Sequence, residues 1–122
     1  MCGIAGFVSS RESAESRTEA IRRMCAAMVH RGPDDEGYAT VHEASLGMRR
    51  LAIFDPAHGH QPMQTADGRY TLVFNGAIYN HRELRAELEQ AGHAFKTHCD
   101  TEVLLLAYAH WQEKCLPRLR GM

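Results

Sequence analysis

A cysteine stands directly after the initiator methionine in this chain, at the head of the apolar segment MCGIAGF. If Met1 is removed, the Cys2 thiol lies beside a free α-amine, and an amine with a pKa of about 8 can accept the proton of a thiol with a pKa of about 8.5. The apolar residues at positions 4–8 predict a buried strand that anchors this end. Alternatively, Cys2 is a small buried hydrophobe at the start of an ordinary strand. These residues alone favour that alternative.

The length and charge of the chain limit its class. It has 122 residues, of which 44% are hydrophobic and 24% charged, with a formal net charge of -1. These values are typical of one globular domain or part of one. No basic stripe, signal-peptide pattern or apolar run of roughly 20 residues is present. We therefore expect neither a nucleic-acid nor a membrane partner.

The cysteines and histidines predict a reduced protein without a metal site. Cys2, Cys25, Cys99 and Cys115 are widely separated, which suits free thiols in the cytoplasm better than a disulfide framework. Structural zinc sites usually need two close pairs of Cys or His, and the eight histidines form no such set. We expect most of these histidines at the surface or in loops.

A helix is predicted over residues 16–30, because apolar residues recur there at steps of three and four. Cys25, Met24 and Met28 belong to this stripe and are expected in the core. The next segment, HRGPDDEG at 30–37, ends the helix at Gly-Pro. It is either a solvated turn or a loop that holds Arg31 near a cleft.

Strands are predicted over residues 38–41 and 46–54, and the second contains Arg49 and Arg50. Adjacent strand residues face opposite sides, so one arginine can face solvent while the other meets an anion or a buried carboxylate. A substrate α-carboxylate suits the planar guanidinium, and an internal salt bridge is an equal alternative. Residues 55–68 are predicted to form a long loop that covers or borders a site.

A strand over residues 70–74 leads into Asn75 and Gly76, and a helix is expected from Asn80, which forms a capping box with Glu83, to Gly92. A turn between strand and helix can direct the Asn75 side-chain amide and the Gly76 N–H at one point, as in an oxyanion hole. A plain turn is the alternative, and it is favoured without other clues.

The last predicted elements are a short strand over residues 95–97 and an apolar helix that begins near Asp100. Asp100 fits the N-cap of that helix, which is its more common role. A carboxylate at this position could also bind a substrate ammonium group.

Taken together, five motifs resemble the N-terminal glutaminase domain of class II glutamine amidotransferases, most closely that of glutamine-hydrolysing asparagine synthetases. They are MCGI at 1–4, HRGPD at 30–34, RLAI at 50–53, NGAIYN at 75–80 and DTEV at 100–103. Their order over most of the chain makes the resemblance specific. It implies that residues 1–122 are the N-terminal portion of an α+β domain with an N-terminal-nucleophile hydrolase fold. In that αββα sandwich, antiparallel sheets lie between helical layers.

The resemblance also implies roles for individual residues. Cys2 would attack the side-chain amide of glutamine while its own α-amine moves the proton, and Asn75 and Gly76 would stabilise the oxyanion. Arg50 would bind the α-carboxylate of the substrate, and Asp100 its α-ammonium group.

The resemblance implies that the backbone around Leu51 and Ile53 lines the glutamine pocket, and that Arg31 belongs to the loop that shapes it. Ala77 is a departure, because asparagine synthetases commonly have Glu there, where it helps to hold the substrate amine. The chain also ends before the later strands of this domain in the family, so we expect an incomplete core and a fragment of a longer product.

The implied reaction forms a glutamyl thioester, releases ammonia and then glutamate. In the family, ammonia passes to a synthetase domain that adenylates aspartate with ATP and magnesium, and that domain is not in these residues. We expect no cofactor within residues 1–122, and a homodimer of the full-length enzyme stays open. The alternatives are a glutaminase with a sugar-phosphate or other acceptor, a β-lactam-forming relative without glutaminase activity, and a non-catalytic fragment that retains the fold.

Overall fold

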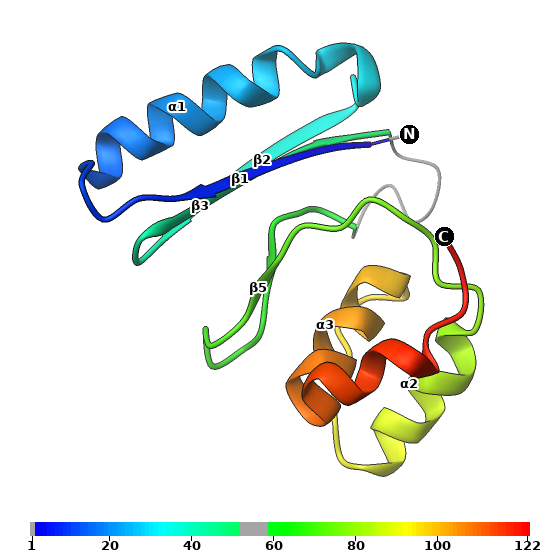
Figure 1. Ribbon diagram of the computed structural model, residues 1–122. Coiled ribbons are helices and arrows are strands. Elements are labelled where there is room, and N and C mark those ends of the chain that lie inside the picture. The colour runs from blue at the N-terminus through cyan, green and yellow to red at the C-terminus, as the bar shows by residue number, and fades with distance from the viewer. Residues whose placement is uncertain (1, 52–58) are drawn as a thin grey trace.

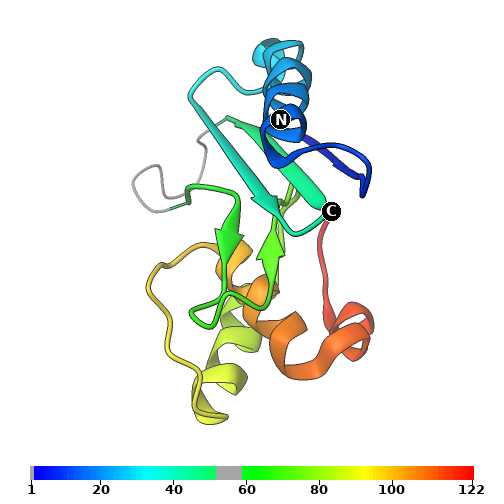
Figure 2. The same cartoon turned by 90° about the vertical axis from the view of Figure 1, so that its left-hand side faces the viewer.

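The computed structural model describes residues 2–51 and 59–122, which form two packed groups of elements. One group is a three-stranded antiparallel sheet covered on one face by helix α1, and the other combines helices α2 and α3 with a two-stranded antiparallel sheet (Figures 1 and 2). The α+β class with antiparallel sheets is thereby confirmed. The elements are β1 (Gly3–Val8), α1 (Ala14–Ala26), η1 (Val29–Arg31), β2 (Asp35–Val41), β3 (Ala44–Arg50), β4 (Met63–Gln64), β5 (Thr71–Leu72), α2 (His81–Gln90), α3 (Asp100–Trp111) and η2 (Gln112–Arg118).

The strand order of the larger sheet is β1-β3-β2, so the N-terminal strand pairs with β3, with Gly3 opposite Arg49. The predicted N-terminal strand is confirmed, but its burial is limited to one face. Ile4 is 46% exposed and Val8 is 73% exposed. Successive strand residues point to opposite faces, and α1 covers only one of them.

Helix α1 begins after Ser13, whose side chain accepts a hydrogen bond from Ser16 N, as an N-cap does. Ile21 and Cys25 are fully buried, one turn apart on the face toward β3. A Cβ at Gly47 of β3 would lie 2.5 Å from Cys25 Sγ, so glycine permits this close approach. The expectation for Met24 was wrong, because Met24 is 42% exposed and lies beside the narrow buried stripe.

A second core lies where α2 and α3 pack together, and its buried members are Ile78, Leu84, Leu88, Val103, Ala107 and Cys115. The predicted end of α2 is confirmed, because Gly92 has φ +94 and its N–H donates to the carbonyl of Glu89. The predicted capping box is wrong. The Asn80 side chain makes no bond to its own helix.

The Asn80 side chain instead ties down the last segment of the chain. Its Nδ2 donates to Arg118 O and its Oδ1 accepts from Arg120 N, both at 2.9 Å. Beside these bonds, Met122 pairs through its backbone with Ala77 at 2.8 and 3.0 Å. Residues 118–122 therefore lie beside residues 77–80 (Figure 1).

The strand predicted over residues 95–97 is also wrong. The N–H groups of Lys96 and Thr97 donate to the Glu102 carboxylate at 2.8 and 2.7 Å, so a side chain takes the place of a partner strand. Within residues 2–51 and 59–122, no helix is long and apolar enough to cross a membrane.

Candidate active site

A cavity of about 210 Å³ lies between the end of β3, the segment after β5 and the start of α3. The residues to which the resemblance gave a catalytic or substrate-binding role line this cavity, except Ile53, which is outside the described residues. These are Cys2, Arg50, Leu51, Asn75, Gly76 and Asp100. Gly59, Gln61, Phe74, Ala77, Cys99, Thr101 and Met122 complete the lining.

Cys2 is held at the cavity by both its backbone and its sulfur. The Sγ atom lies 3.4 Å from Leu51 N, whose N–H donates to it, and 3.8 Å from Leu51 O, which can accept the S–H. Arg31 Nε donates to the Cys2 carbonyl at 3.2 Å. Arg31 therefore fixes the position of Cys2 from the turn after α1, and Leu51 fixes the sulfur.

The adjacent arginines of β3 are both buried, with Arg49 8% and Arg50 6% exposed. Arg49 forms an ion pair with Glu36 and donates through Nε to Gly32 O at 2.9 Å, whereas Arg50 lines the cavity. The prediction that one arginine faces solvent was wrong, because the loop before β2 covers Arg49. A Cβ at Gly32 would lie 2.4 Å from the Arg49 carbonyl carbon, so only glycine allows that loop to approach so closely.

Asn75 and Gly76 are exposed at the cavity wall, in the irregular segment between β5 and α2. A Cβ at Gly76 would lie 2.4 Å from Met122 O, so the Met122 backbone packs directly against Gly76. Asp100 is the first residue of α3 rather than its N-cap, which is Cys99. The Asp100 carboxylate accepts a hydrogen bond from Ile78 N at 2.9 Å, and this bond connects the two walls of the cavity.

Burial separates the four free cysteines into two kinds. Cys25 and Cys115 are fully buried in the two cores, and burial raises the pKa of each thiol. Cys2 and Cys99 line the cavity. Cys2 is the more exposed of these two, while Cys99 is 6% exposed.

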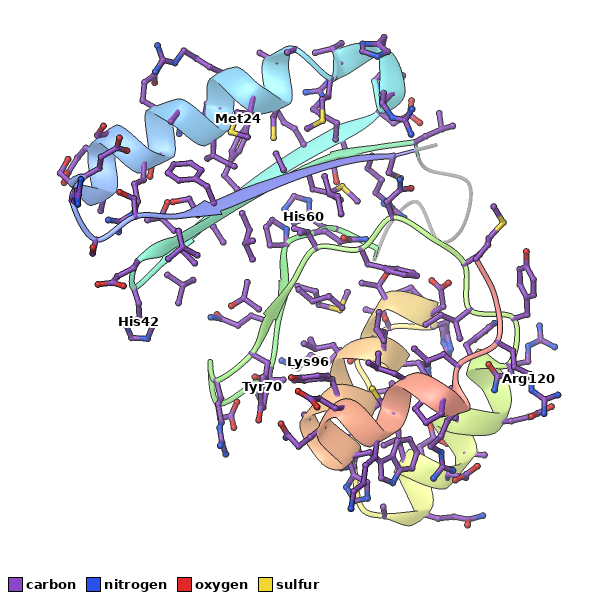
Figure 3. The ribbon with its side chains drawn as sticks, viewed as in Figure 1. Met24, His42, His60, Tyr70, Lys96 and Arg120 are labelled. Carbon is purple, nitrogen blue, oxygen red and sulfur yellow. The ribbon has the colours of Figure 1, made fainter. Side chains whose placement is uncertain are left out.

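The predicted loop over residues 55–68 contributes Gly59 and Gln61 to the cavity, and its end forms β4. Figure 3 shows His60 between the larger sheet and the β4–β5 pair, where its Nδ1 lies 2.8 Å from Asp35 Oδ2. In the described residues, no three His, Cys, Asp or Glu side chains are grouped to hold a metal ion.

Sequence reasoning missed Gln61, Phe74 and Thr101. Gln61 is 5% exposed and Thr101 is 5% exposed. A glutamine before a proline in a polar segment has no signature that distinguishes it from a surface residue. Gln61 Oε1 accepts a hydrogen bond from Phe74 N, and Gln61 Nε2 donates to Thr101 Oγ1. These partners are distant from Gln61 in sequence, so the network can be recognised only in the folded chain.

The chain belongs to the glutamine amidotransferase domain family, which it matches over residues 1–122. It is 44% identical to "Asparagine synthetase [glutamine-hydrolyzing] 1" of Bacillus subtilis (strain 168) over 124 residues, which is 100% of this chain and 20% of that protein. It is 36% identical to "Asparagine synthetase [glutamine-hydrolyzing]" of Zea mays over 122 residues, again 100% of this chain and 20% of the relative. The chain thus spans about a fifth of the length of these relatives.

Proposed function

We propose that residues 1–122 are the N-terminal portion of the glutaminase domain of a glutamine-dependent asparagine synthetase, with an N-terminal-nucleophile hydrolase fold. The observation that carries this proposal is the gathering of a thiol, a guanidinium, an Asn-Gly pair and a carboxylate around one small cavity. A free amino acid needs partners for both of its charged groups, and these side chains supply them.

Glutamine would bind by its amino-acid end. The Arg50 guanidinium matches the geometry of a carboxylate, so it would hold the α-carboxylate with two parallel hydrogen bonds. Asp100 would accept from the α-ammonium group while it keeps its bond to Ile78 N. Ala77 lines the cavity without a polar side chain, so Asp100 carries the ammonium contact in this proposal.

The reaction would be acyl transfer to Cys2 after Met1 is removed. The α-amine takes the thiol proton, the sulfur attacks the carboxamide carbon, and the C–N bond breaks as ammonia leaves with that proton. Asn75 and Gly76 would donate to the oxyanion, where each donor is worth about 10²–10³ in rate. Water then cleaves the thioester and releases glutamate.

Ammonia would be used elsewhere in the complete protein. We propose aspartate as the acceptor, with ATP and Mg²⁺ acting at a synthetase region outside residues 1–122. The described residues offer no grouped ligand set for Mg²⁺, and the hydrolysis of glutamine proposed for them does not involve it. We place the protein in the cytoplasm, where free thiols such as its four cysteines persist. The proposal also includes a homodimer of the complete protein. Its alternative to aspartate is a different ammonia acceptor, such as a sugar phosphate.

The test uses the full-length polypeptide and measures glutamate and ammonia formed from glutamine. Cys2→Ala is expected to abolish both products, whereas Cys115→Ala, which alters a buried thiol outside the cavity, should retain them. Activity that persists in Cys2→Ala would reject the proposal. Asparagine formed on addition of aspartate and ATP would identify the acceptor, and its absence would favour the other acceptors.

A further inference from the structure

Gln61 is a buried amide that connects two walls of the cavity. Its Oε1 accepts from Phe74 N at 2.6 Å, and its Nε2 donates to Thr101 Oγ1 at 3.3 Å. All three residues line the cavity. A buried amide is costly unless its polar atoms are paired, so these two bonds hold the side chain in one orientation.

Both partners of Gln61 are sequence neighbours of proposed substrate-binding residues. Phe74 directly precedes Asn75, and Thr101 directly follows Asp100. The Gln61 amide therefore connects the segment that would bind the oxyanion to the helix terminus that would bind the ammonium group. The bond from Ile78 N to the Asp100 carboxylate also links these walls.

The backbone of Gln61 is itself fixed against the larger sheet. A Cβ at Gly37 of β2 would lie 1.8 Å from Gln61 O and 3.0 Å from Pro62 Cδ, so β2 packs directly on this backbone. Strand β2 pairs with β3, which carries Arg50. Gln61 is thus tied to the elements that carry each proposed contact with the amino-acid substrate.

We propose that Gln61 is a positioning residue for glutamine hydrolysis, whose side-chain amide sets the separation between the oxyanion donors and the ammonium acceptor. This proposal rests on the proposed function. Misplacement of a reacting group by about 1 Å can cost about 10² in rate. Gln61 touches neither reacting atom in this account and acts through Phe74 and Thr101.

The experiment compares two substrates in the full-length polypeptide. Gln61→Met has a similar size but no hydrogen-bonding amide, and we expect it to lower kcat for glutamine by about 10². The second substrate, glutaramate, is glutamine without its α-amine. Glutaramate has no ammonium group, so the separation between the oxyanion donors and the ammonium acceptor should matter less for it. We therefore expect kcat for glutaramate to fall by less than about 10-fold in Gln61→Met. A purely structural role would lower both rates equally.

Matched variants complete the test. Gln64→Met changes an exposed glutamine of β4, outside the cavity, whose Nε2 donates to Thr71 Oγ1, and it should leave both rates within about two-fold of wild type. Thr101→Val removes one partner of Gln61 and should show the same substrate-dependent loss as Gln61→Met, to a smaller extent. If Gln61→Met does not fold, Thr101→Val decides the question.

Equal losses for glutamine and glutaramate, or rates in the Gln61 and Thr101 variants that match Gln64→Met, would overturn the positioning role. These outcomes differ from a failure of the proposed function, in which the wild-type protein itself would not hydrolyse glutamine.

Discussion

Replacement of Asp100 by asparagine separates two roles that the structure gives to this side chain. Its Oδ2 accepts from Ile78 N at 2.9 Å, and its carboxylate faces the cavity proposed to bind glutamine. Asn keeps an oxygen that can accept the Ile78 bond but loses the negative charge. Asp100→Asn should therefore weaken ammonium binding without moving the segment that holds Asn75 and Gly76.

The size of the effect follows from the charge that is lost. A hydrogen bond to a charged group contributes about 1.5–3 kcal/mol. At 1.4 kcal/mol for each factor of ten, its loss raises KM for glutamine roughly 10- to 150-fold. Since the amine does not react, kcat should change by less than about three-fold.

Alanine at position 100 should behave differently. Asp100→Ala also removes the acceptor of Ile78 N, and an unpaired buried N–H costs about 1–3 kcal/mol. Ile78 is 5% exposed and lies two residues after Gly76. We expect this variant to raise KM and to lower kcat as well, by up to the 10²–10³ associated with one oxyanion donor.

The assay measures kcat and KM for glutamine and for glutaramate in the full-length protein. Wild type should prefer glutamine, and Asp100→Asn should lose most of that preference while its kcat/KM for glutaramate is unchanged. If Asp100→Asn keeps the full preference for the amine, Asp100 does not bind the ammonium group and the assignment is wrong.

Two further predictions concern the sheet that carries the site. A Cβ at Gly32 would lie 2.5 Å from the Arg50 nitrogen, so Gly32→Ala should displace Arg50 at a cost of about 1–3 kcal/mol and raise KM for glutamine by at least about 10-fold. Gly6→Ala, whose Cβ would meet a movable Leu46 methyl at 3.0 Å, is the control, and equal KM values in both would contradict this reasoning. Burial raises the pKa of the Cys25 thiol above its ordinary value, so the unfolded chain loses this proton first and the free energy of unfolding falls as pH rises above that ordinary value. Measured by pulse proteolysis in urea, the free energy of unfolding should fall less steeply with pH in Cys25→Ala than in wild type. Identical slopes would show that the Cys25 thiol does not cause the pH dependence.

Much of the fold follows from patterns that are local in sequence. The N-terminal strand, the helices and the stop at Gly92 depend on side-chain periodicity and on backbone conformations that glycine adopts easily. The predictions that were wrong for these elements concern which of their side chains are buried. Met24 belongs to a helical apolar stripe, yet α1 covers the sheet with a narrower face centred on Ile21 and Cys25.

The remaining features depend on partners that are distant in sequence. Asn80 has the local pattern of a helix cap, but Arg118 and Arg120 provide backbone partners 38 and 40 residues away. Lys96 and Thr97 form no strand because the Glu102 carboxylate satisfies their N–H groups. These hydrogen bonds form because the folded chain brings their donors and acceptors within bonding distance.

The candidate site shows the same division. Cys2, Arg50 and Asp100 could be named from the sequence because each lies in one of the five motifs, although each residue alone also fits a plain structural role. Gln61 could not, since its importance in this account comes from two hydrogen bonds that span 13 and 40 residues.

A covalent label can test whether the Cys2 sulfur attacks the glutamine carboxamide. The full-length protein would be treated with a glutamine analogue that carries a chloromethyl ketone in place of the carboxamide, and its peptides would be mapped by mass spectrometry. We predict one adduct on a Cys2 that has lost Met1, with excess glutamine preventing its formation. An adduct on Cys99, which lines the same cavity, or a native protein that retains Met1, would contradict the account.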